Sequence, residues 1–150
     1  MIVLDELERR SDLPTKKLAV KWAIVIDRDL PRGLQANAAA CLAASVGATV
    51  PAIVGSGGVD AAGLAHSGLP WTGCAVLGAP AAILRRIRTD AAAEPGLVVA
   101  DMANIAQRAD VYDEYLAELA RTDEPSYYAV SLFGPRALVE RLTGRLPLLR

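Results

Sequence analysis

Apolar runs alternate with amphipathic or alanine-rich segments along the chain, and this alternation predicts strands and helices in turn. The apolar runs predict four strands, over residues 18–27, 74–78, 97–102 and 127–133. The segments that follow predict a turn and helix over 30–46 and further helices over 80–93, 104 or 106 to 121, and 135–143. Pro31, Pro80 and Pro135 suit the first turns of their helices. Alternating strands and helices favour a layered α/β domain.

The chain divides into a short N-terminal extension, residues 1–16, and a single domain, residues 17–150. A length of 150 residues is enough for one domain with a sizeable core. The longest stretch without a clear period runs from residue 48 to 73 and is rich in glycine, so we expect an irregular loop there. Its GSGG segment lacks the Lys and Ser/Thr of a phosphate-binding loop and is interpreted as a hinge.

Composition and charge limit the kinds of molecule that this protein is expected to bind. Hydrophobic residues make up 53% of the chain and aromatic residues 5%, so the core is expected to consist of Ala, Val, Leu and Ile. Sixteen Lys and Arg residues are balanced by 17 Asp and Glu residues. Nucleic-acid binding needs clustered cations, so this balance argues against a nucleic-acid partner. The arginines at 85, 86 and 88 are interpreted as a solvated helix face.

The two cysteines and the lack of a long apolar segment point to a cytoplasmic protein. Cys41 and Cys74 stand in apolar runs without metal-ligand spacing, so we expect reduced core thiols. We expect no metal and no cofactor, because a single histidine and no cysteine cluster leave only carboxylates as ligands. No segment has the length of a membrane span, and the acidic start is unlike a secretory signal.

Two segments resemble the archaeal/eukaryotic (type two) peptidyl-tRNA hydrolases. The first is WAIVIDRDLPRGLQANAAACLAA, from Trp22 to Ala44, and the second is SLFGPRALVERLTGRLPLL, from Ser131 to Leu149. In that family a strand ending in Asp-Leu leads to a helix, and a later strand ending in Gly-Pro leads to a short helix and a Thr-Gly turn. The resemblance implies a three-layer α/β/α sandwich with a four-stranded mixed sheet.

The catalytic positions of that family are not kept. Its helix carries Lys, Gln and His where this chain has Ala36, Ala40 and Ala43, and methyl groups cannot move a proton. Asp101 keeps the acid of the family's third motif, whereas Ile105 replaces its Thr. The resemblance therefore implies the fold and argues against the hydrolase activity.

A closer overall resemblance is to the domain-of-unknown-function 2000 (DUF2000) family, which is described as sharing this fold and has no established activity. The DRDLPRGLQANAAACLAA stretch, the loop with Gly, Asp and His, and the LTGRLPLLR ending carry it. Membership implies a fold and not a reaction.

His66 and Asp101 are the candidate catalytic residues. His66 is the only histidine and titrates near neutral pH, which suits an acid or base in a loop; a lone loop histidine without a function is the alternative. Asp60, six residues earlier, is a candidate to orient it. Asp101 stands at a strand end, where α/β sheets place ligand-binding groups, although it could instead cap the following helix.

Arg28 and Asn37 complete the candidate ligand-binding residues, with Asp60. Arg28 lies at the mouth of the first strand and could bind an anion, although pairing with Asp29 is the simpler expectation. Asn37 is a poor helix-interior residue, which marks it either as a ligand contact or as a partner of a neighbouring loop.

Three functions remain open. The first is a small-molecule binder or unassigned enzyme whose pocket is bounded by the first helix, the His66 loop and Asp101. The second is a peptidyl-tRNA hydrolase with relocated residues. The third is a non-catalytic assembly module that buries an apolar face in a homodimer; the high apolar fraction and the alanine-rich helix favour a homodimer in any case.

Overall fold

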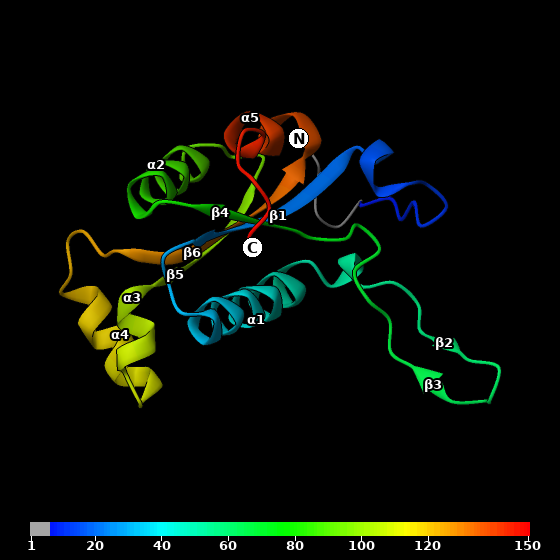
Figure 1. Cartoon of the computed structure of the whole chain (residues 1–150), viewed down its shortest axis with the longest axis horizontal. Helices are drawn as coiled ribbons and strands as arrows, with labels where there is room; N and C mark the ends of the chain where they lie inside the picture. Colours follow the sequence, from blue (N-terminus) through cyan, green and yellow to red (C-terminus); the bar gives the residue numbers. More distant parts are fainter. Residues whose placement is uncertain (1–6) are drawn as a thin grey trace.

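A four-stranded sheet with helices on both faces forms the body of the protein (Figure 1). The structure is a computed structural model and describes residues 7–150. In chain order its elements are η2 (Thr15–Lys17), β1 (Val20–Asp27), α1 (Arg32–Thr49), η3 (Pro51–Ile53), β2 (Gly58–Val59), β3 (Ala65–His66), β4 (Ala75–Ala79), α2 (Ala81–Ala92), β5 (Val98–Ala103), α3 (Asn104–Arg108), α4 (Tyr112–Ala120), β6 (Tyr127–Pro135) and α5 (Arg136–Thr143).

The main sheet is mixed, and β1 lies inside it. The strand order is β4-β1-β6-β5. β1 pairs in parallel with β4 and antiparallel with β6, and β6 pairs antiparallel with β5. The C-terminal tail covers the outer side of β4, where Leu149 N–H donates to Val76 O at 3.0 Å. The prediction of an α/β domain with a four-stranded mixed sheet is therefore confirmed.

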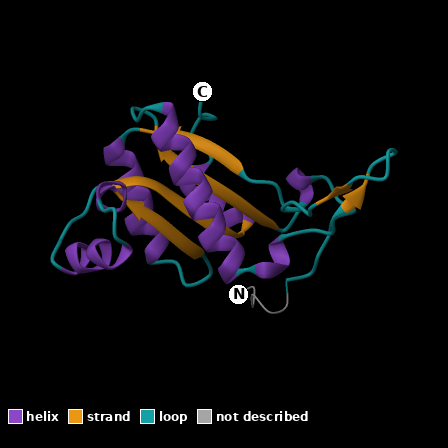
Figure 2. Cartoon of the chain, turned by 90° about the horizontal axis from the view of Figure 1, so that it is seen from below, coloured by secondary structure: helices purple, strands orange, loops and turns teal. Residues whose placement is uncertain are grey.

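The two faces of β1 enter two different cores. Trp22, Ile24 and Ile26 point to one side and pack with α1, whereas Ala23 and Val25 pack with α2 and α5 on the other. All five side chains are buried. Figure 2 shows α1 crossing one face of the sheet, and Figure 1 shows α2 and α5 on the opposite face. The helices and the sheet thus form three layers.

One buried polar pair joins the central strands. Trp22 Nε1 donates a hydrogen bond to Ser131 Oγ at 2.8 Å, from β1 to β6. Both side chains are buried, so neither group can replace this partner with water.

The predicted elements are found with small shifts at their ends and two larger differences. The helix predicted up to residue 121 is divided into α3 and α4, because residues 109–111 have extended or irregular backbone. The stretch from 48 to 73 is not wholly irregular, because it contains η3 and the β2–β3 hairpin. This hairpin projects from the body at the C-terminal end of α1 (Figure 1).

The described part of the N-terminal extension runs along the domain. Leu7 packs against the core that includes Trp22. The Arg136 guanidinium, from α5, donates to the carbonyl oxygens of Thr15 and Leu18. These contacts join residues 7–19 to the domain, and residues 1–6 of the predicted extension lie outside the described part. No helix in residues 7–150 is long and apolar enough to cross a membrane.

We predict that Ser131→Ala lowers the free energy of unfolding by about 1–3 kcal/mol, because the buried indole N–H of Trp22 loses its acceptor. Urea denaturation followed by tryptophan fluorescence measures the change. Ser126→Ala, at an exposed serine just before β6, is the matched control and should be neutral. Equal stability of the two variants would contradict the assigned role of the pair.

Candidate functional site

A cleft of about 490 Å³ lies where α1, the end of β5, α3 and α4 meet. Its volume is in the range of small-molecule sites in proteins. Asp101 and Met102 come from β5, and Asn37, Cys41 and Ser45 come from one side of α1. The remaining walls include Gln107 of α3, Asp110 of the connecting turn, and Tyr112 and Tyr115 of α4. The cleft thus combines carboxylates, amides and tyrosine rings.

An ion pair with an arginine of α2 holds the Asp101 carboxylate at the cleft. Arg88, from α2, donates from Nε to Asp101 Oδ2 at 3.2 Å, and the side chain of Asp101 keeps 25% of its exposure. The Arg88 guanidinium also lies 5.4 Å from the centre of the Tyr127 ring, which fixes its position. Asp101 does not cap α3, whose N-cap residue is Ala103 and has no side-chain cap. The capping alternative is therefore wrong.

The hydroxyl of Tyr115 has a raised pKa. Burial raises the pKa of its hydroxyl first, and the charges of Asp101, Tyr112 and Tyr127 raise it further. Tyr112 and Tyr115 stand edge to face, with ring centres 5.6 Å apart. The phenol therefore stays protonated and can donate a hydrogen bond in the cleft.

The α1 wall is a polar stripe at helical spacing. Asn37, Cys41 and Ser45 are four residues apart and therefore lie on one side of the helix. The Gln107 amide donates to Asn37 Oδ1, which joins α1 to α3. Asn37 therefore contacts a neighbouring segment, which confirms one of its two alternatives, and it also lines the cleft, where a ligand contact stays a prediction. Sequence reasoning missed Cys41, Ser45 and the tyrosines, although the i, i+4, i+8 spacing of the stripe was a visible signal.

Cys41 corrects one sequence-based expectation. It is exposed on α1 and not part of the core, whereas Cys74 is partly buried. Helix α1 buries only the positions that face the sheet, which are Gln35, Ala38, Leu42 and Val46, so a thiol at position 41 points outward.

The β2–β3 hairpin holds the Asp60–His66 pair. His66 Nε2 lies 3.1 Å from Asp60 Oδ2. Asp60 Oδ1 accepts the backbone N–H groups of Ala62 and Leu64 at 2.9 and 3.0 Å, so the same carboxylate organises the turn. The hydrogen bond from His66 and these backbone bonds hold the pKa of Asp60 below its usual value. Asp60 does therefore orient the imidazole.

Within one copy of the chain, the hairpin and the cleft are separate. The hairpin follows the C-terminal end of α1, whereas α3 and α4 flank its N-terminal half (Figure 1). The structure brings Asp60 to His66 and Asn37 to the cleft of Asp101, but it does not bring these two groups together. Arg28 lies elsewhere, in a shallow hollow beside Asp29 and the C-terminal tail. Among the described residues no ion pair joins Arg28 to Asp29, so the expected pairing of these two side chains is wrong; the Asp29 backbone N–H donates to Asp27 Oδ1 at 2.9 Å.

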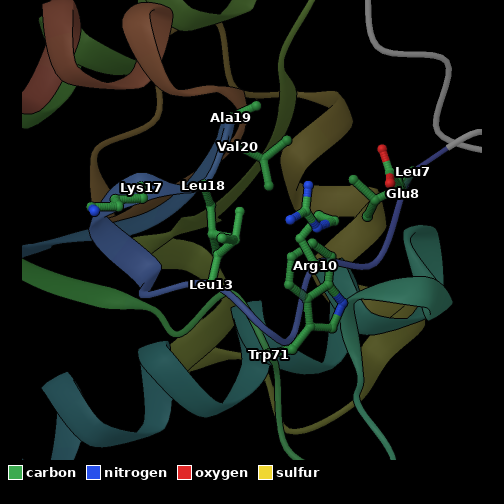
Figure 3. Close-up of a pocket in the computed structure, with 9 residues that line it drawn as sticks. All are labelled: Leu7, Glu8, Arg10, Leu13, Lys17, Leu18, Ala19, Val20 and Trp71. Atoms are coloured by element: carbon green, nitrogen blue, oxygen red, sulfur yellow. The ribbon is translucent and has the colours of Figure 1, made fainter.

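A second cavity, of about 400 Å³, lies under the N-terminal segment (Figure 3). Its lining is mainly apolar and includes Leu13, Leu18 and Trp71. The guanidinium of Arg10 donates two hydrogen bonds to Asp12 at 2.9 and 2.8 Å. This cavity lies between residues 7–19 and the domain, and its charged lining residues, Glu8, Arg10 and Lys17, all come from the N-terminal segment.

No group of three His, Cys, Asp or Glu side chains in residues 7–150 is arranged to hold a metal ion. The cleft itself supplies carboxylates, amides, phenols and one thiol.

Comparison with known proteins identifies a family and a fold. Residues 20–150 match the family described as Protein of unknown function (DUF2000), which confirms that resemblance. A solved structure of a protein of unknown function from Agrobacterium tumefaciens is similar, with a TM-score of 0.79 and 19% identity, over 87% of this chain and 98% of that chain. At this identity the likeness shows the fold alone. Among curated proteins, none matches the chain.

We predict that N-ethylmaleimide modifies Cys41 at least roughly tenfold faster than Cys74, because the reactive form is the thiolate. Cys41 is exposed, whereas burial raises the pKa of the Cys74 thiol to about 12. Peptide mass spectrometry over a time course measures both rates. Unfolding in urea should make the rates similar, and similar rates in the folded protein would contradict the arrangement.

Proposed function

The chain belongs to the DUF2000 family, and we propose that it binds a small amine-bearing molecule in the cleft between α1, β5 and α4. The observation that carries this proposal is the composition of the lining. Its charged side chains are the carboxylates of Asp101 and Asp110, and no lysine or arginine lines it. A cationic ligand would meet both carboxylates and the faces of two tyrosine rings.

The other groups of the cleft suit orientation of such a ligand. The Tyr115 hydroxyl, whose pKa is raised by burial and by the nearby Asp101, can donate a hydrogen bond. Ser45 and the amides of Asn37 and Gln107 supply further donors and acceptors around the rim. Met102 and the ring of Tyr112 provide apolar contact for an aromatic or aliphatic portion of the ligand. A primary amine on a ring-bearing chain therefore fits this chemistry best.

We predict that phenethylamine raises the melting temperature and that 3-phenylpropionate, of similar size but opposite charge, does not. At a concentration a hundredfold above Kd, binding adds about 2.7 kcal/mol, which raises the melting temperature by roughly 5 to 10 °C. Loss of a charged hydrogen-bond partner is worth about 1.5–3 kcal/mol, so Asp101→Asn should weaken binding roughly tenfold to a hundredfold.

Asp90→Asn is the matched control, because Asp90 is an exposed aspartate on α2, in the opposite layer. It should bind the amine as the unaltered chain does. A response to both amine and carboxylate, or an unchanged response in Asp101→Asn, would overturn the assignment of this cleft to a cationic ligand.

We also propose that the domain has the peptidyl-tRNA hydrolase type-two fold without its activity. The fold proposal is supported by the mixed sheet, by Gly134 and Pro135 at the end of β6, and by Asp101 near the end of β5. Superposition on a member of that family should reproduce the strand order and directions; a different order would contradict it.

The activity is disfavoured because α1 presents methyl groups at the family's polar positions. Ala36 and Ala40 are exposed, and Ala43 is half-buried. We predict that the purified protein releases no tRNA from N-acetyl-aminoacyl-tRNA above the rate without protein. Hydrolysis that purifies with the protein, and that Asp101→Asn abolishes, would instead support the hydrolase with relocated residues.

A further inference from the structure

The face of the molecule that carries α1 has a raised part at each end. Figure 1 shows α3 and α4 beyond the N-terminal half of α1 and the β2–β3 hairpin beyond its C-terminal end. Figure 2, seen from below, shows α1 crossing the sheet between these two projections. Helix α1 therefore lies at the bottom of a concave surface between the two projections, which we call the saddle.

Apart from the exposed Arg32 at its first position, the outward face of α1 carries no charge. From Gly33 to Leu84 the only Asp, Glu, Lys or Arg is Asp60, and the only histidine is His66. The outward positions of α1 include Ala36, Ala40, Ala44 and Ala48, all exposed. Solvent-facing helix surfaces normally carry charged side chains, so a helix that is apolar or neutral all round usually has a neighbour. Small side chains would let that neighbour approach closely.

The exposed large hydrophobic side chains gather on the two projections. Among the described residues, all of them except Leu148 lie on the hairpin and its base or in and just before α4. On the hairpin side Val59 and Leu69 are 71% and 77% exposed, and on the α4 side Tyr112 is 71% exposed. None of the nine residues of α4 is buried in the described chain. Patches of this kind mark interaction surfaces.

We propose that a second copy of this chain covers the saddle, with the two α1 helices packed antiparallel about a two-fold axis. In this arrangement each hairpin lies over the partner's α3–α4 projection, so the two apolar patches of one copy meet the two of the other. A two-fold interface brings the same surface of each copy together, so charges near the axis would repel their own copies. Arg32 stands at the end of α1, away from the middle of the helix, and the rest of the α1 face is neutral and avoids that repulsion.

A stable dimer interface needs more surface than α1 alone provides, so both projections have to take part in it. An α1 of 18 residues is about 27 Å long and about 10 Å wide, so its outer face offers roughly 300 Å². A stable interface buries about 800 Å² on each partner. Helix packing alone falls short, and the hairpin and α4 supply the remaining surface. A heterologous partner would not need two patches at matching ends of one helix.

This dimer would complete the cleft, a consequence that rests on the proposed function. The hairpin of one copy carries the Asp60–His66 pair toward the α3–α4 end of the other. The partner's His66 would then stand at the rim of the cleft that holds Asp101, and the site would contain residues from both copies. The hairpin is anchored for this role at its base, where Trp71 Nε1 donates to Ala52 O at 2.9 Å and Gly55 N–H donates to Leu69 O at 2.8 Å.

The first test measures oligomeric state without any ligand. Light scattering on the full chain should give twice the monomer mass. Ala44→Glu, on the outward face of α1, should give a monomer because two carboxylates would oppose each other at the axis. Ala82→Glu, an exposed alanine on α2, is the matched control and should remain dimeric. A monomeric unaltered chain, or a dimer in both variants, would overturn the proposal.

The second test places the hairpin on the partner. In a Cys41→Ala background, the Ser67→Cys variant is mixed with the Asp110→Cys variant and treated with a short bismaleimide. Covalent heterodimers should form in the mixture and far less in either variant alone. Absence of the mixed product from a chain that is dimeric by light scattering would show a different dimer.

The third test asks whether the site is shared. Binding of phenethylamine, followed by thermal shift, should weaken at least fivefold in His66→Ala as well as in Asp101→Asn. Subunit exchange between these two variants should restore one intact site in each mixed dimer, and hence up to half of the sites in that species. A dimer that binds the amine but shows no restoration would overturn the shared site and leave the proposed function standing. A dimer that forms the mixed cross-link but binds no amine would contradict only the proposed function.

Discussion

Burial of β1 on both of its faces is the constraint on which the rest of the structure depends. The strand has a neighbour on each side, and its side chains alternate between two cores. A strand in this position cannot face water, so helices must cover both sides of the sheet. The layers of α1 on one face and of α2 and α5 on the other follow from that need, as does the internal hydrogen bond of Trp22 with Ser131.

The cleft forms where this layered packing ends. Helix α1 packs closely along β1, and α3 buries Ile105, but α4 has no buried residue. Because α1 packs tightly on the sheet and α4 packs loosely, a space remains between them. The side chains that border this space need not be apolar. Asp101 can keep its charge there because Arg88 approaches from the α2 side while the cleft stays open on the other.

The hairpin differs from the rest of the domain. Local hydrogen bonds hold it together, and packing against the core does not. Asp60 accepts three hydrogen bonds from within the hairpin, and β2 and β3 have only exposed residues. A short two-stranded hairpin is marginal by itself in water. Its exposed valine and leucines, together with the neutral face of α1, are the main physical reason to expect a covering partner.

The sequence by itself determined the order of the elements, the family, and the chemistry available to a site. Strand and helix periods depend on neighbouring residues, so the four strands of the main sheet and helices α1, α2 and α5 could be predicted, as could the proximity of Asp60 to His66. Only the tertiary structure decided that Cys41 faces outward, that α3 and α4 are separate, and that His66 lies far from Asp101 within one copy. Helix α1 is rich in alanine, so the spacing of its larger side chains marks the buried face only weakly. The direction in which a glycine-rich stretch projects depends on contacts between residues distant in sequence.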